Sequence, residues 1–392
     1  MPPIKPFQLQ FLLLLTLYCI SPSVFSQHRH CGTVEYQRTL RDQLNLRETD
    51  QKFEQWLLQN KQTTRTQKNT RQQTPPYKIP VVVHVINNGE NIGSGTNISD
   101  AQILSQISVL NKDYKRLNAD ASNTPAEFLS VAGSMDIEFV LAKRDPEGQA
   151  TNGIVRVQGT KAEWLMSDNY ELKSLSYWPA EDYLNIWVCN ITDYLGYAQF
   201  PVSGLPGLEN SSTNRLTDGV VIWYKAFGSS DDGAFPLDPK YNKGRTATHE
   251  IGHFFGLRHI WGDDGGECTG TDYCNDTPNQ TGSSSGCPAH PRTTCSEVNM
   301  FQNFLDYTDD ACMNLFTQDQ VDRMSIVIEN SDRRKSLLTS LGDELPSPVA
   351  NDIGIKTILS PTETQCSADV TPSIEVKNYG NNTITSVRVR LK

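Results

Sequence analysis

Three histidines and one glutamate fall within residues 249–259, which read HEIGHFFGLRH. Residues four apart share one face of a helix, so His249 and His253 can point at the same ion. Gly256 tolerates the left-handed conformation that ends a helix, and the turn there would bring His259 back as a third ligand. Three imidazoles leave one tetrahedral position open to water, which is typical of catalytic zinc. The segment therefore predicts a Zn²⁺ site.

The residue after the first histidine, Glu250, predicts the reaction. Bound zinc lowers the pKa of its water and polarises a scissile carbonyl. Glu250 would take the proton of that water and pass it to the leaving amine. The alternative is a buried helix with structural histidines. The extended motif argues against it, because Gly256 and His259 add two matches in register.

Composition excludes one class of partner. The chain has 392 residues, 35 basic and 45 acidic, and a formal net charge of -10. This balance favours solubility and argues against nucleic acid as the main partner. The length exceeds what one compact domain usually needs, so extra segments are expected.

The N-terminus predicts export. Lys5 precedes an apolar run over residues 11–20, and small residues near Ser26 offer a cleavage point. We therefore expect a signal peptide over residues 1–26 and a secreted protein. A membrane anchor is the alternative, but a run of about ten residues is too short to span a bilayer. No other segment of the sequence could cross a membrane, so no span is expected once the signal is removed.

A polar segment follows, over residues 27–74, and predicts a pro-segment or a plain disordered tail. Its last part, residues 61–74, has no apolar residue and is expected to be an exposed linker where an activating cut could fall. Cys31 stands near its start. A thiolate is a good fourth zinc ligand, so Cys31 could occupy the water position and keep the enzyme latent. A bond to Cys366 or an unpaired thiol are the alternatives.

The elements that must position the histidines are predicted by hydrophobic periodicity. Strands are expected over residues 79–86, 135–143, 183–191 and 219–224. Helices are expected over residues 98–117, with Ser99 as N-cap, over 245–257 and over 318–338. Strands that lead into a helix and then into an irregular stretch predict an α/β sheet domain followed by a loop-rich lobe.

From residue 346 to residue 392 the pattern changes to alternating strands, over 352–359, 373–378 and 384–391. We expect the start of a β-sandwich module. Three strands are too few to close one, so the chain is expected to be a fragment of a longer protein.

The zinc motif and its flanks resemble a known family. HEIGHFFGLRH matches the metzincin signature, and residues 260–263 (IWGD), 276–280 (DTPNQ) and 303–317 (NFLDYTDDACMNLFT) are similar to the cytophagalysin–pappalysin branch. The resemblance covers about Tyr77 to Leu338. It implies a zincin catalytic domain over residues 75–342, with a twisted sheet and an active-site helix. Its upper subdomain would end near residue 259, its lower subdomain would span residues 260–342, and a cleft would separate them.

The resemblance also implies roles for single residues. Tyr307 would lie near the zinc and stabilise the transition state; a packed aromatic in a turn is the alternative. The family's turn beneath the zinc carries methionine where this chain has Leu305, and Met300 is close but out of register. Leucine has a similar volume and should be tolerated. Met313 would lie near the pocket for the residue after the scissile bond, which predicts an apolar rather than acidic pocket.

Five cysteines lie between residues 268 and 312, after the motif, and their spacing alone leaves the pairing open. The resemblance implies two bridges in the lower subdomain, Cys268–Cys295 and Cys287–Cys312. Cys274 has no expected partner, and Cys189 lies in an apolar strand, where a buried thiol is expected.

The stretch after the motif is rich in carboxylates, which suit Ca²⁺. Relatives also bind calcium in this region, so Asp272, Asp276 and Thr277 are the candidate ligands. A solvated acidic loop is the alternative.

The sequence therefore predicts a secreted zinc endopeptidase made as a zymogen, with proteins or peptides as substrates. A surface adhesion protein with a peptidase-like scaffold is the second hypothesis. It conflicts with the intact set of histidines and Glu250, since a scaffold has no need of a base. Zinc hydrolysis of a non-peptide substrate is the third hypothesis, and the oligomeric state is left open.

Overall fold

A computed structural model describes residues 29–44, 50–68, 76–201, 215–346, 350–360 and 371–390. The predicted signal peptide, residues 69–74 of the predicted linker and Cys366 lie outside these ranges.

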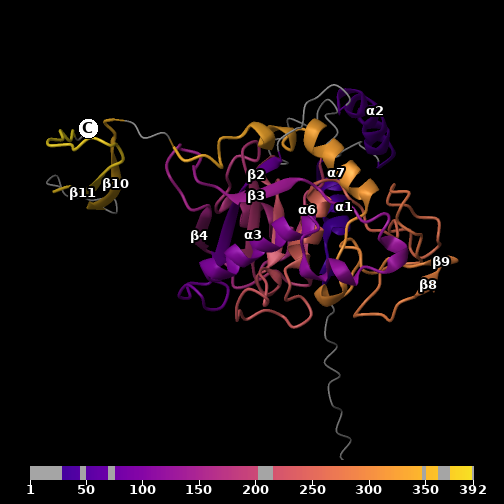
Figure 1. Ribbon diagram of the computed structural model, residues 1–392. Helices are drawn as coiled ribbons and strands as arrows, with labels where there is room; N and C mark the ends of the chain where they lie inside the picture. Colours follow the sequence, from indigo (N-terminus) through magenta and orange to yellow (C-terminus); the bar gives the residue numbers. More distant parts are fainter. Residues whose placement is uncertain are drawn as a thin grey trace, which may run out of the picture.

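A mixed sheet forms the centre of the molecule (Figure 1), with strand order β1-β6-β7-β5-β2-β3 and β4 also paired to β2. Its strands are β1 (His30–Cys31), β2 (Tyr77–Asn87), β3 (Ile137–Leu141), β4 (Ile154–Gln158), β5 (Leu184–Cys189), β6 (Tyr194–Ala198) and β7 (Val220–Trp223). The pairs from β7 through β5 to β2, β3 and β4 are parallel, whereas β6 is antiparallel to β7. Strands and helices in one domain confirm the predicted α/β class.

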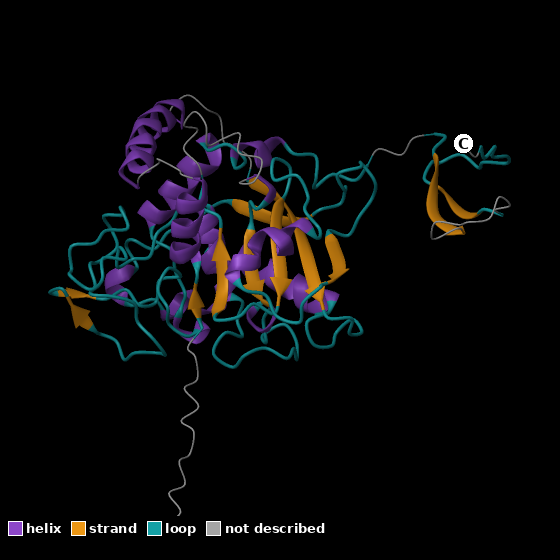
Figure 2. Ribbon diagram, turned by 180° about the vertical axis from the view of Figure 1, so that it is seen from behind, coloured by secondary structure: helices purple, strands orange, loops and turns teal. Residues whose placement is uncertain are grey.

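The central strands are buried on both faces. In β2 every residue from Ile79 to Asn87 is buried, as expected for a parallel strand covered on both sides. Helix α3 (Asp100–Tyr114) contacts β3, and helix α6 (Arg245–Phe254) contacts β6 and β7. As predicted, α3 begins at Ser99, whose hydroxyl accepts the Gln102 backbone N–H. Figure 2 shows helices packed against the sheet.

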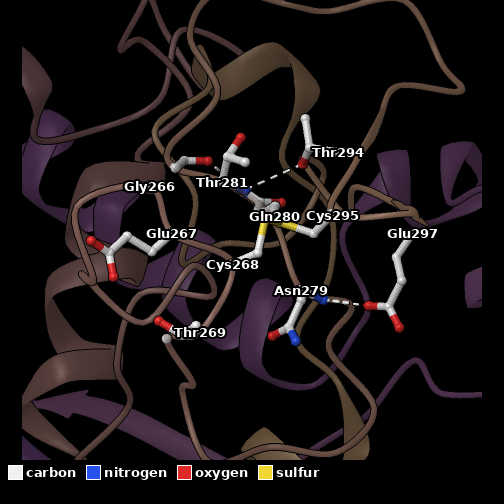
Figure 3. Close-up of a disulfide and its surroundings, with 12 residues drawn as sticks. Gly266, Glu267, Cys268, Thr269, Asn279, Gln280, Thr281, Thr294, Cys295 and Glu297 are labelled. Carbon is white, nitrogen blue, oxygen red and sulfur yellow. Dashed lines mark hydrogen bonds between the residues drawn. A yellow bond between two sulfur atoms is a disulfide. The ribbon is translucent and has the colours of Figure 1, made fainter.

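The lower part of the molecule is mostly irregular. It holds the short strands β8 (Thr293–Thr294) and β9 (Glu297–Val298) and ends in helix α7 (Gln318–Asn330). Disulfides join Cys268 to Cys295, shown in Figure 3, and Cys287 to Cys312, which confirms both implied pairs. Since most of this region is irregular, such cross-links help to hold its loops together.

The closing helix is shorter than predicted. The sequence predicted a helix to residue 338, but α7 ends at Asn330 and a 3₁₀ turn over Lys335–Thr339 follows. The chain turns because Arg333 has a φ of 58°, in the left-handed region. Arg333 and Arg334 both bind the buried carboxylate of Asp218, and this ion cluster stabilises the turn.

The predicted pro-segment is folded against the catalytic domain. After β1 it forms helix α1 (Thr33–Leu44) and helix α2 (Asp50–Lys68). The phenyl ring of Phe53 and the side chain of Leu57 are buried against Ile326 and Val327 of α7. Helix α2 extends over residues 61–68, the first half of the predicted linker.

The C-terminal strands are confirmed only in part. β10 (Ile353–Ser360) and β11 (Ser373–Asn378) form an antiparallel hairpin, which stands apart from the sheet in Figures 1 and 2. Residues 384–390, predicted as a third strand, form none. A strand needs a partner for its backbone groups, and β10 and β11 pair here only with each other. The described residues also include a short helix, α4 (Asn169–Ser174). Among the described residues, no helix combines the length and apolar character needed to span a bilayer.

Candidate active site

Three imidazoles converge at the end of α6. His249 and His253 lie four residues apart on the helix, which ends before Gly256, a residue with a φ of 88°. The turn brings His259 back to the same point. The Nε2 atom of His253 lies 3.0 Å from that of His249 and 3.1 Å from that of His259.

The other ring nitrogen of each histidine has a fixed partner. The Nδ1 atoms of His249 and His253 lie 2.7 and 2.8 Å from the carbonyl oxygens of Phe304 and Leu257. His259 Nδ1 lies 2.8 Å from Asp263 Oδ1. Nδ1–H donation to these oxygens leaves all three Nε2 lone pairs facing one centre, as metal-ligating histidines require.

Cys31 completes the group. Its sulfur and the three imidazoles place their ligand atoms within 4.8 Å of one another, and all four residues are buried. Burial lowers the pKa of His249 to about 3 and that of His253 well below its usual range, so both rings are neutral and can donate a lone pair. Imidazole and thiolate donors in a four-fold group suit zinc. The cluster therefore fits a metal site.

The thiol of Cys31 is protonated without a cation. Burial and the nearby Glu250 carboxylate raise the pKa of the Cys31 thiol well above its usual value. A divalent cation at the centre of the cluster reverses this balance, because a coordinating thiol is deprotonated outright.

Glu250 lies beside the cluster and touches the pro-segment. It is fully buried, and its Oε2 atom accepts a 2.8 Å hydrogen bond from the Thr33 hydroxyl. Its Oε1 atom is buried with no hydrogen-bond partner among the described residues. Burial raises the pKa of Glu250 to about 7. A carboxyl poised near neutral pH is suited to accept and return a proton. No local pattern predicts the contact between Glu250 and Thr33.

Tyr307 and Leu305 lie where the resemblance implied. The ring of Tyr307 is 4.8 Å from that of His259 and 5.8 Å from that of His249, between centroids. Its hydroxyl donates a 3.3 Å hydrogen bond to the carbonyl of Cys31. Leu305 is fully buried and faces Gly252 of α6, so leucine provides the apolar floor beneath the histidines.

A pocket opens on one side of the histidines. Its walls include Leu195 of β6, Tyr241, Met313 and Asp310. Met313 lines this cavity together with Asp310. That the pocket receives the residue after the scissile bond, and that its floor is apolar, stay predictions. One oxygen of Asp310 accepts the backbone N–H groups of Lys243 and Arg245. Sequence reasoning missed Asp310, although it lies only three residues after Tyr307.

Two of the three candidate calcium ligands, Asp272 and Thr277, are in direct contact. The Thr277 hydroxyl donates to both oxygens of the buried Asp272, at 2.8 and 3.0 Å. One oxygen of Asp276 accepts the Asp319 backbone N–H, and the other is buried without a partner among the described residues. Asp263, from the same acidic stretch, is instead the partner of His259.

A second contact binds the pro-segment to the catalytic domain through an ion cluster. Glu54 of α2 is buried and accepts two hydrogen bonds from the Arg323 guanidinium of α7, at 2.5 and 2.6 Å. Arg258, within the zinc motif, adds a bond of 3.2 Å to the same carboxylate. Sequence reasoning missed this cluster, since its members lie more than 200 residues apart and no local pattern links them.

The described cysteines outside the disulfides are Cys31, Cys189 and Cys274, and all three are buried. The buried thiol expected at Cys189 is confirmed. Cys274 is unpaired, as expected from the two implied bridges.

Comparison with known proteins agrees with this geometry. Residues 169–329 match the peptidase family described as pregnancy-associated plasma protein-A. An extracellular metalloprotease of Arthroderma benhamiae is 27% identical over 81% of this chain and 96% of its own length. A second from the same fungus is 32% identical over 64% of this chain and 71% of its own length. The names of these relatives confirm the predicted extracellular location.

Solved structures of mirolysin from Tannerella forsythia are also similar. Mature mirolysin in complex with a cleaved peptide has 49% identity and a TM-score of 0.61, and covers 70% of this chain and 100% of its own. A promirolysin mutant has 44% identity and a TM-score of 0.64, and covers 82% of this chain and 100% of its own. The histidine cluster, the fold and these relatives agree: the chain belongs to the pappalysin family of metzincin zinc metallopeptidases.

Proposed function

We propose that this protein is a secreted endopeptidase in which His249, His253 and His259 hold one catalytic Zn²⁺ and Glu250 is the general base. The observation that carries the proposal is the convergence of three imidazoles: the Nε2 atoms of His249 and His259 lie within 3.1 Å of that of His253, beside a buried carboxylate. Substrates are proteins or peptides, as the cleaved peptide bound to mature mirolysin supports.

Different residues of the chain have different roles in the proposed reaction. Bound zinc would supply a Lewis acid for the scissile carbonyl and a water of lowered pKa. Glu250 takes a proton from the attacking water at its carboxylate and returns it to the leaving amine. The Tyr307 hydroxyl would donate to the oxygen that becomes negative in the transition state. The pocket of Met313 and Asp310 would receive the residue after the scissile bond.

We also propose that residues 27–74 form a pro-segment, that the catalytic domain spans residues 75–342 and that a β-sandwich-like module begins near residue 346. The folded pro-segment supports latency, since Cys31 meets the histidines and Thr33 bonds Glu250. The similarity to promirolysin supports it too, because that match covers more of this chain than the match to mature mirolysin. Helix α2 shields the backbone of residues 61–68, so we propose the activating cut within residues 69–74.

The zinc proposal is tested with His253→Ala in the activated protein. Wild type should contain one zinc per chain and cleave peptides. The variant should lose most of its zinc and show no cleavage above background, because two ligands remain where catalytic sites use three. Zinc is read by elemental analysis, and circular dichroism checks that the fold is retained. A folded variant that cleaves like wild type would refute the assignment.

Calcium at Asp272, Asp276 and Thr277 is a further proposal. Burial raises the pKa of Asp272 to about 7, so its ionised form is less stable in the folded protein than in the unfolded chain. Stability therefore falls as pH rises from about 4 through 7, and a bound cation would offset that loss. At 100 times its dissociation constant Ca²⁺ should raise Tm by about 5–10 °C near pH 8 and by far less near pH 5.5. Calorimetry gives the shift. Asp276→Asn should abolish it, and an equal shift in that variant would reject the site.

A further inference from the structure

The pro-segment inserts one side chain deep into the catalytic domain. Tyr36 of α1 is only 2% exposed. Its hydroxyl donates to Gln199 Oε1 at 3.2 Å and accepts from Asn169 Nδ2 at 3.0 Å. A tyrosine whose hydroxyl is satisfied as both donor and acceptor occupies a site built for a phenol, not merely an apolar gap.

The walls of this pocket belong to the catalytic domain. The ring of Tyr197 lies 4.8 Å from that of Tyr36, between centroids, and its hydroxyl bonds Asn169 Oδ1 at 3.0 Å. The ammonium group of Lys173, fully buried, lies 5.2 Å from the Tyr36 ring centroid and donates to the Thr217 carbonyl at 2.6 Å. These groups are fixed by one another, so the pocket should persist when the pro-segment leaves.

The pocket that holds Tyr36 follows the pocket of Met313 along the same strand, β6. Leu195 lines the pocket of Met313 and Asp310. Next along the strand, the carbonyl of Gly196 accepts the Gly32 N–H at 2.8 Å, beside the histidine cluster. Gln199, just beyond the strand, binds Tyr36. Along this strand, Leu195 marks the pocket of Met313, Gly196 contacts the pro-segment next to Cys31, and Gln199 marks the pocket of Tyr36.

An extended peptide can pair with the edge of a strand and place alternate side chains in pockets. If the Met313 pocket receives the residue after the scissile bond, the pocket that holds Tyr36 faces residues before it. We propose that in the activated enzyme this pocket is a substrate subsite for a tyrosine on the amino-terminal side of the scissile bond. The proposal rests on the endopeptidase function.

The hydrogen bonds of the pocket predict that it distinguishes tyrosine from phenylalanine by the tyrosine hydroxyl. A phenylalanine would fill the space but leave the Asn169 amide without the acceptor that Tyr36 provides. Sites built to bond a substrate hydroxyl reject the analogue that lacks it, since a buried polar group then loses its partner. The preference of tyrosine over phenylalanine should be about tenfold or more in kcat/KM.

The test uses the full chain activated by the linker cut. Peptides that differ only in tyrosine, phenylalanine or alanine at each of four positions before the scissile bond are compared. One position should show the tyrosine preference, and Gln199→Leu or Asn169→Leu should reduce the tyrosine-to-phenylalanine ratio to about one. The exposed Gln158→Leu is the matched control and should keep the ratio. The rate at which each variant cleaves the alanine peptide shows whether that variant is folded and active.

The same ratio is required in the affinity of these peptides for the Glu250→Gln variant, which is measured without catalysis. This separates the subsite from the endopeptidase proposal, because a protein that cleaves nothing still reports binding. No preference for tyrosine at any position, in cleavage or binding, would overturn the inference. A preference that survives both Gln199→Leu and Asn169→Leu would overturn it as well.

Discussion

Replacing Glu250 by glutamine is expected to lower kcat/KM for peptide cleavage by about 10²- to 10⁴-fold while zinc stays bound. The reason is geometric. Glutamine fills the same space beside the histidines but cannot accept a proton at neutral pH. Glu250 is not one of the residues whose ligand atoms converge, so its replacement leaves the metal ligands unchanged.

The measurement is steady-state cleavage of one peptide by the activated protein, with zinc content determined on the same sample. Glu147→Gln is the matched control, because this exposed glutamate undergoes the same chemical change far from any ligand. Wild-type rates in Glu250→Gln with zinc bound would remove the base from its assigned role. Loss of zinc in the variant would instead make Glu250 a determinant of the metal site.

Replacing Cys31 by alanine is expected to speed activation of the uncut protein by at least about tenfold, which corresponds to about 1.4 kcal/mol. The thiolate would be a fourth ligand to zinc, and alanine leaves that position to water. The same replacement does not free the pro-segment. Thr33 still bonds Glu250, and Glu54 still pairs with Arg323.

The contributions of Cys31 and of the Glu54–Arg323 ion pair to latency can be separated by combining substitutions. Glu54→Gln removes the charge that neutralises Arg323, and breaking a buried ion pair costs about 3–5 kcal/mol. The double variant Cys31→Ala with Glu54→Gln should therefore activate faster than either single variant. Activation is followed as the appearance of peptide cleavage and of the trimmed chain on a gel. Cys189→Ala, which changes another buried thiol away from the histidines, is the control. Unchanged latency in Cys31→Ala would reject the metal-ligand role of this cysteine.

Local patterns made the zinc site predictable. His249 and His253 share a helix face because of their spacing, and Gly256 marks the turn that returns His259. Strands β2, β3, β5 and β7 were predictable as well, since a buried parallel strand such as β2 is a continuous apolar run. Strands β1, β4 and β6 were not predicted. The disulfide pairs came from the resemblance, because five cysteines in one loop-rich stretch allow several pairings.

Other features depend on contacts that no local pattern contains. Thr33 meets Glu250 across 217 residues, and Glu54 meets Arg323 across 269. The end of α7 depends on Asp218, which binds two arginines from a distant segment. Asp310 was not predicted as a pocket residue, because its place depends on the backbone N–H groups of Lys243 and Arg245, which lie more than 60 residues away in the sequence. The polar N-terminal stretch docks as a pair of helices, since Tyr36 and Leu40 of α1 join the main core and Phe53 and Leu57 of α2 pack against α7.

In the proposed mechanism, one zinc ion held by three histidines drives peptide cleavage. The most direct test removes the metal from the activated protein with a chelator, follows casein and peptide cleavage, and then restores zinc in steps. With a single catalytic zinc, cleavage should disappear with the metal and return in proportion to added zinc, reaching its maximum at one ion per chain. Cleavage that persists in the metal-free protein, or fails to return in folded protein with one zinc bound, would contradict it.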